Sequence, residues 1–373
     1  MRIGVPKEIK NHEYRVGLTP QSVAELSALG HEVWVETHAG AAIGFADEDY
    51  LEAGAQIARN SAEVFQQGQL IVKVKEPLAV ERARLRAHHT LFTYLHLAPD
   101  RAQTEELMAG GATCIAYETV TDAQGRLPLL APMSEVAGRM SIQAGAGCLE
   151  KARGGRGVLL GGVPGVAPGK VVILGAGVVG SHALAMAVGL GADVTVLDKS
   201  VDALRRLDAQ YGNRITTLYS TRASVREQVL AADLVIGGVL IPGAAAPKLI
   251  TAEMVRQMKV GAVLVDVAID QGGCAETSRA TTHAEPTYVV DDVVHYCVAN
   301  MPGAVARTST LALNNATLPF VVALAQKGTR RALQEDPHLL AGLNVARGII
   351  TCASVAEAHD LRFQSPASVI EQL

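Results

Sequence analysis

Four polar residues follow predicted β-strands, at positions where side chains could take part in chemistry. Arg15 lies in the loop KNHEYRVGLTP after the first strand, and Lys75 ends the run IVKVK. His96 ends TLFTYLH, on the same face as Tyr94 by the period of a strand, and Asp270 ends VLVDVAID before a QGG turn. A guanidinium binds a carboxylate through two parallel hydrogen bonds, while an imidazole or a carboxylate can move protons. Because ligands of open α/β sheets bind at the carboxyl ends of strands, we predict that these residues serve a small-molecule site.

Each of these residues also has a structural explanation, which the sequence leaves open. Arg15 and Lys75 could be solvated surface charges. His96 could be a structural histidine, one of 11 in the chain, and Asp270 could simply start a turn. The four lie at strand ends in two predicted domains that could face one cleft. Their combination therefore favours a functional site more than any single residue does.

The first third of the chain alternates short β-rich runs with helical patterns, which indicates a parallel sheet wrapped by helices. The β-rich runs are residues 2–8, 32–37, 70–77, 90–97 and 113–120. After the first run, LTPQSVAELSALG has Thr19 as a predicted N-cap, Pro20 at the first helical position and Gly30 as a stop. This punctuation predicts a helix directly after the first strand.

The alternation resumes after a glycine-rich stretch at residues 153–170, near which we predict a hinge. The later strands are predicted near residues 171–175, 193–198, 215–219, 233–238, 262–267 and 287–290. Six strands with helices between them make a complete doubly wound sheet. After about residue 304 the pattern becomes helical, in STLALNNATLPFVVALAQKG and then LAGLNVARGIITCASVAEAH, and we expect these helices to pack back on the first domain.

A glycine motif opens the second half of the chain. Gly175, Gly177 and Gly180 of GAGVVG match G-x-G-x-x-G between the apolar run VVIL and the helical stretch VVGSHALAMAVGLGA. The first glycine permits a tight turn, the second lets a pyrophosphate approach the backbone, and the third lets helix and strand pack closely. The structural alternative is a glycine turn that binds no nucleotide. The strand and helix around the motif favour dinucleotide binding.

The cofactor is predicted from the residue that ends the next strand. Asp198 could accept hydrogen bonds from the adenosine ribose hydroxyls and would repel a 2′-phosphate, which favours NAD over NADP. Lys199, Arg205 and Arg206 lie nearby and could weaken this preference, or they could be ordinary solvated charges.

Together these patterns predict an α/β protein with two doubly wound Rossmann-like domains separated by a cleft. We expect a substrate domain at residues 1–130, with residues 305–373 packing back on it, and an NAD-binding domain at residues 131–304. The length of 373 residues agrees, because a single core rarely exceeds about 250 residues.

Composition limits the classes of molecule that we expect this protein to bind. The net charge of -4, with mixed signs throughout, predicts no basic surface that would bind nucleic acid or anionic lipid. No run reaches the roughly 18 apolar residues of a membrane span, and Met1 leads into a charged segment rather than a signal sequence. The five cysteines show no zinc spacing, so we expect no metal site. These features predict a cytoplasmic protein whose partners are small molecules.

Several segments resemble the alanine dehydrogenase family over nearly the whole chain. They are MRIGVPKEIKNHEYRVGLTP, KVKEP, FTYLHLA, YETV, LLAPMSEVAGRM, LGAGVVG, VDVAIDQGG and VANMPGAVARTSTLALNNATLPF. Some of them are shared with the nucleotide-binding subunit of proton-translocating transhydrogenase, whereas KVKEP, FTYLHLA and AIDQGG separate the two relatives better. The resemblance implies a two-domain protomer that forms a homohexamer and interconverts L-alanine with pyruvate and ammonia, using NAD.

The resemblance also implies roles for individual residues. Arg15 and Lys75 would hold the substrate carboxylate, and His96 and Asp270 would be the acid/base pair. The NAD site would be lined by Ser134, Gly175, Gly177, Val178, Val179, Gly180, Asp198, Ser220, Val239, Leu240, Val267, Ala268, Asp270, Val298, Asn300 and Met301. Of these, Asn300 and Met301 would lie near the nicotinamide.

The sequence leaves two other functions open. A transhydrogenase-type subunit would pass hydride between nucleotides and would have no amino-acid pocket. A nucleotide sensor would keep the dinucleotide-binding domain without catalysis, and would not need Lys75, His96 and Asp270 at strand ends.

Overall fold

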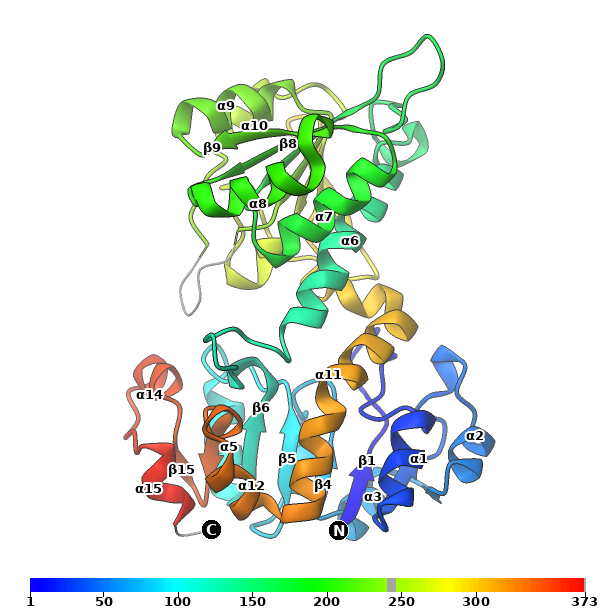
Figure 1. Ribbon diagram of the computed structural model, residues 1–373, viewed down its shortest axis with the longest axis vertical. Helices are drawn as coiled ribbons and strands as arrows, with labels where there is room; N and C mark the ends of the chain where they lie inside the picture. Colours follow the sequence, from blue (N-terminus) through cyan, green and yellow to red (C-terminus); the bar gives the residue numbers. More distant parts are fainter. Residues whose placement is uncertain (240–245, 372–373) are drawn as a thin grey trace. The chain divides into compact units, whose positions relative to one another are not determined.

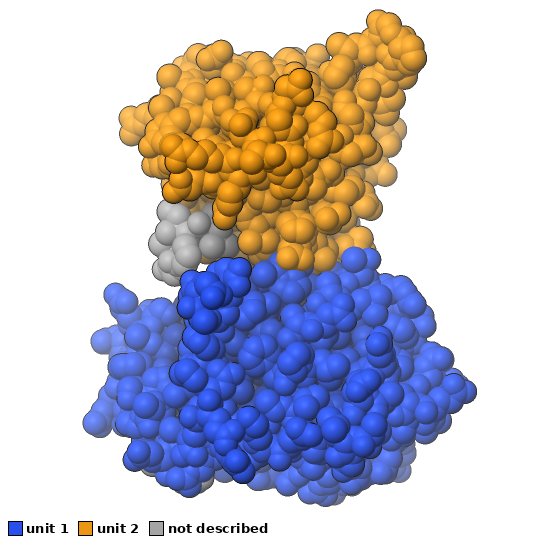
Figure 2. All heavy atoms as spheres, in the orientation of Figure 1, with its two compact units in different colours: residues 1–133, 306–373 blue, residues 134–305 orange. Residues whose placement is uncertain are grey.

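The computed structural model describes residues 1–239 and 246–371, which form two compact units. Unit 1 comprises Met1–Met133 and Ala306–Leu373, and unit 2 comprises Ser134–Val305 (Figure 2). Each unit is built on one predominantly parallel sheet with helices packed against it (Figure 1). This confirms the predicted α/β class.

The sheet of unit 1 has eight strands in the order β15-β14-β6-β5-β4-β1-β2-β3. The strands are β1 (Arg2–Val5), β2 (Glu32–Glu36), β3 (Gln56–Ala58), β4 (Leu70–Val72), β5 (Thr90–Thr93), β6 (Thr113–Ala116), β14 (Leu343–Ala346) and β15 (Ile349–Ile350). The helices are α1 (Pro20–Ala28), α2 (Asp47–Glu52), α3 (Ser61–Gln67), α4 (Ala79–Arg82), α5 (Arg101–Gly110), α11 (Ala306–Lys327), α12 (Thr329–Glu335), α13 (Pro337–Leu340), α14 (Ala353–His359) and α15 (Pro366–Ile370). Strands β1 to β6 pair in parallel, so their carboxyl ends lie at one edge of the sheet.

Local sequence explains the first crossover of unit 1. The Thr19 side chain accepts a hydrogen bond from the Ser22 amide, Pro20 occupies the first turn of α1, and Gly30 follows the helix with φ +80°. These residues match the predicted start and stop. The helix buries Val23 and Leu26.

The C-terminal prediction was wrong between residues 343 and 350. Instead of continuous helix, this stretch forms the antiparallel strands β14 and β15, and β14 extends the sheet beside β6. Arg347 and Gly348 have φ values of 50° and 79°, the positive pair required by a tight two-residue hairpin turn. Helix resumes only at α14.

The sheet of unit 2 has seven strands in the order β12-β13-β11-β10-β7-β8-β9. The strands are β7 (Lys170–Leu174), β8 (Asp193–Asp198), β9 (Thr216–Tyr219), β10 (Leu234–Gly237), β11 (Val263–Asp266), β12 (Thr287–Val290) and β13 (Val293–Tyr296). The main helices are α6 (Ala131–Cys148), which begins three residues before the boundary, α7 (Val178–Gly189), α8 (Val201–Tyr211), α9 (Arg222–Ala231) and α10 (Ala252–Gln257). From β9 to β13 the parallel strands follow the 3-2-1-4-5-6 order of dinucleotide-binding sheets.

The sixth parallel strand differs from the prediction. Residues 287–290 form β12, an antiparallel edge strand, whereas β13 supplies the sixth parallel strand beside β11. Asp291 and Asp292, with φ values of 47° and 60°, make the tight turn between β12 and β13. The glycine-rich stretch near which we predicted a hinge lies within unit 2.

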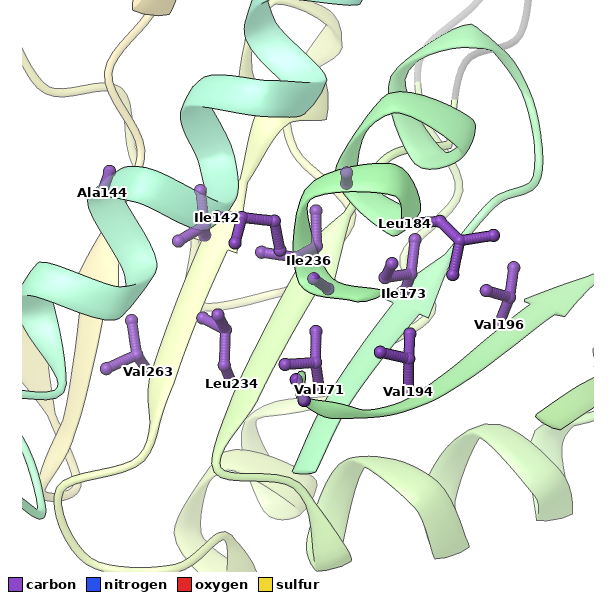
Figure 3. Packing of buried hydrophobic residues seen from close by; sticks show 14 of the residues in the cluster. Ile142, Ala144, Val171, Ile173, Leu184, Val194, Val196, Leu234, Ile236 and Val263 are labelled. Carbon is purple, nitrogen blue, oxygen red and sulfur yellow. The ribbon is translucent and has the colours of Figure 1, made fainter. Parts of the chain in front are cut away.

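The core of unit 2 covers both faces of its sheet. On one face, Ile142 of α6 and Leu184 of α7 belong to the same buried cluster as Ile173, Val194 and Ile236 of the strands (Figure 3). Helices α9 and α10 contribute to a second cluster that includes Val172, Val235 and Leu264. Helices on both faces make the sheet doubly wound.

One stretch of the described residues, Met301–Lys327, contains an 18-residue window with the mean hydropathy (1.2) of a membrane span, and 44% of that window is buried within this protein. Its helical part, α11, makes polar contacts inside unit 1. The Asn314 side-chain oxygen accepts hydrogen bonds from the Thr19 amide and the Ser22 hydroxyl, both at 2.9 Å. These contacts make α11 a core helix of unit 1.

Candidate active site

The glycine loop of unit 2 has the geometry that the motif predicts. Gly175 has φ +105°, a conformation that side chains rarely adopt. A Cβ on Gly180 would lie 1.7 Å from the carbonyl oxygen of Gly175, so only glycine lets α7 start this close to β7. A Cβ on Gly177 would meet no atom within 4 Å. Gly177 is therefore not required by packing within the chain, and its exposed surface leaves room for a group that approaches the backbone.

Asp198 connects the glycine loop to the end of β8. One carboxylate oxygen accepts a hydrogen bond from the Ala176 amide and the other from the Ser200 amide, each at 2.6 Å. The side chain is partly exposed. These two amides fix the carboxylate beside the loop, where each oxygen still has a lone pair for a ribose hydroxyl.

Most of the other residues predicted for the NAD site follow the carboxyl ends of the parallel strands of unit 2. Ser220 follows β9, Val239 follows β10, Val267, Ala268 and Asp270 follow β11, and Val298, Asn300 and Met301 follow β13, while Val178 and Val179 start α7 and Ser134 lies in α6. Leu240 lies outside the described residues. Neighbouring loops are in contact, since the Gly238 amide donates to the Leu174 carbonyl and the Ser220 amide donates to the Asp198 carbonyl. One sheet edge thus carries a glycine cradle, a helix N-terminus and an acid, which fit a dinucleotide.

Replacing Gly180 with Ala tests this cradle. We expect the thermal midpoint to fall by several degrees and NADH binding to weaken, because overpacking costs about 1–3 kcal/mol and displaces the loop. Gly189→Ala in the same helix is the matched control, since a Cβ there meets no atom within 4 Å. Thermal melts and NADH fluorescence titrations of both variants would show the difference. Equal behaviour of the two would contradict the assigned role of Gly180.

In unit 1, Arg15 is a buried guanidinium held by Glu13. The Arg15 Nε and Nη2 atoms donate to the two carboxylate oxygens of Glu13 at 2.7 and 2.6 Å. Burial alone would lower the pKa of Arg15, but hydrogen bonding and charge from Glu13 outweigh it and raise the pKa. Nη1 lies 3.1 Å from the Met133 sulfur. Arg15 is therefore fixed and charged rather than a solvated surface group, which removes that structural alternative.

Lys75 lies three residues beyond the end of β4 rather than at its last residue. Its Nζ atom is 3.6 Å from a carboxylate oxygen of Glu76, and the other oxygen pairs with Lys10. Burial, the largest effect, raises the pKa of Glu76, but Lys75 and Lys10 together lower it to about 2. Glu76 is therefore an anion near neutral pH, and its carboxylate lies beside the Lys75 amine at the carboxyl edge of the sheet.

His96 also lies three residues beyond its strand, β5, and has φ 49°. Its amide donates to a carboxylate oxygen of Glu118 at 2.6 Å, and its Nδ1 atom is 4.0 Å from the same oxygen. The ring stacks on Tyr94 with a centroid distance of 5.8 Å, and 43% of its side chain is exposed. The imidazole is thus oriented by an acid and an aromatic ring yet accessible to a ligand, unlike a buried core histidine.

The structure brings together three of the four predicted chemical residues, since Arg15, Lys75 and His96 all follow parallel strands at one edge of the unit 1 sheet. Asp270 belongs to unit 2, in the short 3-10 helix Val267–Gln271. That turn is capped by Asp266, whose carboxylate accepts from the Ala268 amide at 3.1 Å.

Sequence reasoning missed three acids, Glu13, Glu76 and Glu118. Glu13 and Glu76 are close in sequence to the predicted residues Arg15 and Lys75, which was a signal for them. Glu118 follows the observed strand β6, but it lies inside the run predicted at residues 113–120, so the strand-end rule did not select it. Within residues 1–239 and 246–371, no three His, Cys, Asp or Glu side chains lie close enough together to hold a metal ion.

Comparisons with known proteins agree with this geometry. Family models described as "Alanine dehydrogenase/PNT, N-terminal domain" and "Alanine dehydrogenase/PNT, C-terminal domain" match residues 4–137 and 141–353. An alanine dehydrogenase of Halomonas elongata is 62% identical over 370 residues, which cover 99% of this chain and 100% of that protein. One from Mycolicibacterium smegmatis is 54% identical with the same coverage.

Solved structures show the same relation. An L-alanine dehydrogenase superposes with a TM-score of 0.94 at 54% identity, covering 96% of this chain and 99% of that chain. A transhydrogenase from Sinorhizobium meliloti superposes with a TM-score of 0.81 at 25% identity, covering 95% and 100%. The family models and the full-length relatives confirm the predicted resemblance: this chain belongs to the alanine dehydrogenase/PNT family.

Proposed function

We propose that this protein is an NAD-dependent L-alanine dehydrogenase, which interconverts L-alanine with pyruvate and ammonia. The observation that carries the proposal is full-length similarity, at 62% and 54% identity, to two proteins named alanine dehydrogenase. Formation of NADH from NAD and L-alanine tests it.

Unit 1 would bind the substrate. A 2-oxo acid carries a carboxylate, for which the fixed Arg15 guanidinium and the Lys75 ammonium are suitable partners. Lys75 also has the reach to contact the neighbouring carbonyl or amino group. In this proposal the substrate carboxylate replaces part of the contact that Lys75 makes with Glu76.

His96 and Asp270 would move the protons. A nicotinamide bound in unit 2 would supply the acceptor for the hydride of the alanine Cα, which would leave the substrate as an iminium. Water then adds to the substrate iminium, and Asp270 would take the proton that this water loses. Asp270 would then return its proton to the carbinolamine nitrogen so that ammonia can leave, while His96 would accept the hydroxyl proton at an imidazole nitrogen. In the reverse direction His96 would donate that proton to the pyruvate oxygen.

Two alternatives differ in what they require. A transhydrogenase subunit needs no amino-acid pocket, and the transhydrogenase structure is only 25% identical to this chain. A nucleotide sensor gives no reason for Arg15, Lys75 and His96 to gather at one sheet edge. Both alternatives predict that L-alanine does not reduce NAD.

The NAD preference is proposed from Asp198, whose carboxylate would repel a 2′-phosphate. We expect Asp198→Ala to shift the ratio of kcat/KM values toward NADP, helped by the neighbouring Lys199. Because Asp198 also accepts from the Ala176 amide, Asp198→Asn serves as a second variant that keeps an acceptor oxygen beside the loop. Kinetics with both cofactors measure the ratio, and an unchanged ratio in both variants would remove Asp198 from the adenosine site.

The family resemblance further supports a cytoplasmic homohexamer that acts on small molecules, without nucleic-acid or membrane partners. Native mass spectrometry of the purified protein would measure the number of subunits. A species of six chains is expected.

A further inference from the structure

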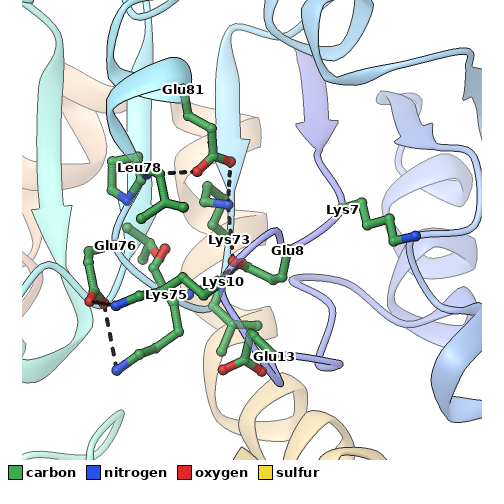
Figure 4. Close-up of polar contacts among 12 residues, drawn as sticks. Lys7, Glu8, Lys10, Glu13, Lys73, Lys75, Glu76, Leu78 and Glu81 are labelled. Atoms are coloured by element: carbon green, nitrogen blue, oxygen red, sulfur yellow. Dashed lines mark hydrogen bonds and ion pairs between the residues drawn. The ribbon is translucent and has the colours of Figure 1, made fainter.

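A buried network of three charges lies beside Lys75 but includes none of the residues assigned above. Lys73 is fully buried, and its Nζ atom donates to carboxylate oxygens of Glu81 at 2.6 Å and Glu8 at 3.1 Å (Figure 4). Glu8 and Glu81 are 5% and 1% exposed. The three side chains come from the loop after β1, from the end of β4 and from α4.

The remaining hydrogen bonds of this network go to the main chain of the segment that carries Lys75. The second oxygen of Glu8 accepts from the Val74 amide at 2.7 Å and from the Lys75 amide at 3.2 Å. The second oxygen of Glu81 accepts from the Leu78 amide at 2.9 Å. Both ends of the segment 74–78 are therefore hydrogen-bonded to carboxylates that contact the same buried lysine, Lys73.

A residue at the end of β5 holds the main chain of Lys75 by its carbonyl group. The Thr93 hydroxyl, at the end of β5, donates to the Lys75 carbonyl at 3.0 Å, and Thr93 is fully buried. The main chain of Lys75 is thus bound at its amide by Glu8 and at its carbonyl by Thr93. From this fixed point the partly exposed side chain extends toward Glu76.

Stability alone is a poor explanation for these charges. Removing ions from water costs free energy, and buried ion pairs can often be replaced by apolar side chains without loss of stability. Burial also raises the pKa of Glu8, with Lys73 as the main opposing influence. What apolar residues could not provide is the set of acceptor oxygens that Glu8 and Glu81 present to three amides.

We propose that Glu8 and Thr93 are positioning residues for Lys75, which set where its ammonium group meets the substrate carboxylate. This inference rests on the proposed function, because it assigns the network to substrate binding through Lys75. Reacting and binding groups displaced by about 1 Å can lose up to about 10²-fold in rate, so a small shift of this peptide would be measurable.

Three variants separate positioning from charge. Glu8→Gln removes the charge but keeps an oxygen for the two amides, Glu8→Leu removes both, and Thr93→Val removes only the hydroxyl. We expect Glu8→Leu and Thr93→Val to raise the KM for pyruvate about tenfold, with a smaller change in kcat, and Glu8→Gln to raise it less. The dissociation constant of NADH should remain unchanged in all three.

Asp233→Asn is the matched control for loss of a buried acid. Asp233 is 7% exposed, accepts from the Lys170 amide at 2.8 Å and pairs with Lys259 at 2.9 Å, at the start of β10. The Asp233→Asn substitution should lower the thermal midpoint of the protein without changing its KM for pyruvate. An unchanged KM in Thr93→Val, or an equal rise in Asp233→Asn, would overturn the positioning role, even if Glu8→Leu failed to fold. Wild-type protein that cannot aminate pyruvate would instead overturn the proposed function.

Discussion

Asp270→Asn is expected to lower turnover by about 10²- to 10⁴-fold in both reaction directions, the usual range for a general acid or base. Asn keeps the size and hydrogen bonding of the side chain but cannot accept the proton that the attacking water loses. If Asp270 merely started the turn before Gln271, Asn would replace it well, because both residues are common in turns. The measurement is steady-state turnover with L-alanine and with pyruvate, beside a thermal melt.

Asp266→Asn gives the contrasting control for Asp270. The buried Asp266 carboxylate accepts from the Ala268, Cys274 and Ala275 amides at 3.1, 2.8 and 3.3 Å. Its replacement should lower the thermal midpoint, because an amide nitrogen would face some of these donors. Asp270→Asn should melt like the wild type. An Asp270→Asn protein with near wild-type turnover would remove Asp270 from catalysis.

Lys75→Ala is expected to lower kcat/KM for pyruvate by about 10²-fold while leaving NADH binding intact, since a hydrogen bond to a charged group contributes about 1.5–3 kcal/mol. The fold should survive, because Glu76 keeps its contact with Lys10. Steady-state kinetics and NADH fluorescence titration are the two measurements.

Lys10→Ala is the control, because Lys10 is the other lysine that contacts Glu76. We expect a change in kcat/KM of less than about threefold, because the partly exposed Lys10 contacts Glu76 rather than the substrate. A parallel loss of NADH binding in Lys75→Ala would mean that the variant is misfolded or that Lys75 does not serve the substrate.

Most strands could be predicted from runs of apolar and β-branched residues, because parallel strands are buried on both faces. Strand β3 (Gln56–Ala58) was not predicted, and two further errors have a common cause. Residues 291–292 and 347–348 form two-residue turns with positive φ, although Asp-Asp and Arg-Gly are not the usual Asn-Gly or Asp-Gly signals. Without those signals, the sequence does not separate β13 from β12, and its apolar pattern predicts helix where β14 and β15 form.

The basic residues of the candidate site could be proposed from the sequence because charge near a strand end is visible there. Their acidic partners were less so. Glu13 and Glu76 are close neighbours of Arg15 and Lys75 in the chain, but sequence alone does not show that their carboxylates turn toward them. The buried contact of Glu8 with the Lys75 amide joins residues 67 positions apart and depends on the pairing of β1 with β4.

The central claim, oxidation of L-alanine with NAD, is tested most directly by the absorbance of NADH formed when the purified wild-type protein is mixed with L-alanine and NAD. We predict NADH formation that depends on L-alanine, yields pyruvate and ammonia in equal amounts, and runs in reverse when NADH, pyruvate and ammonium are supplied. Absence of NADH with L-alanine, together with hydride transfer from NADH to an NADP analogue, would contradict the proposed function and favour a transhydrogenase-type protein.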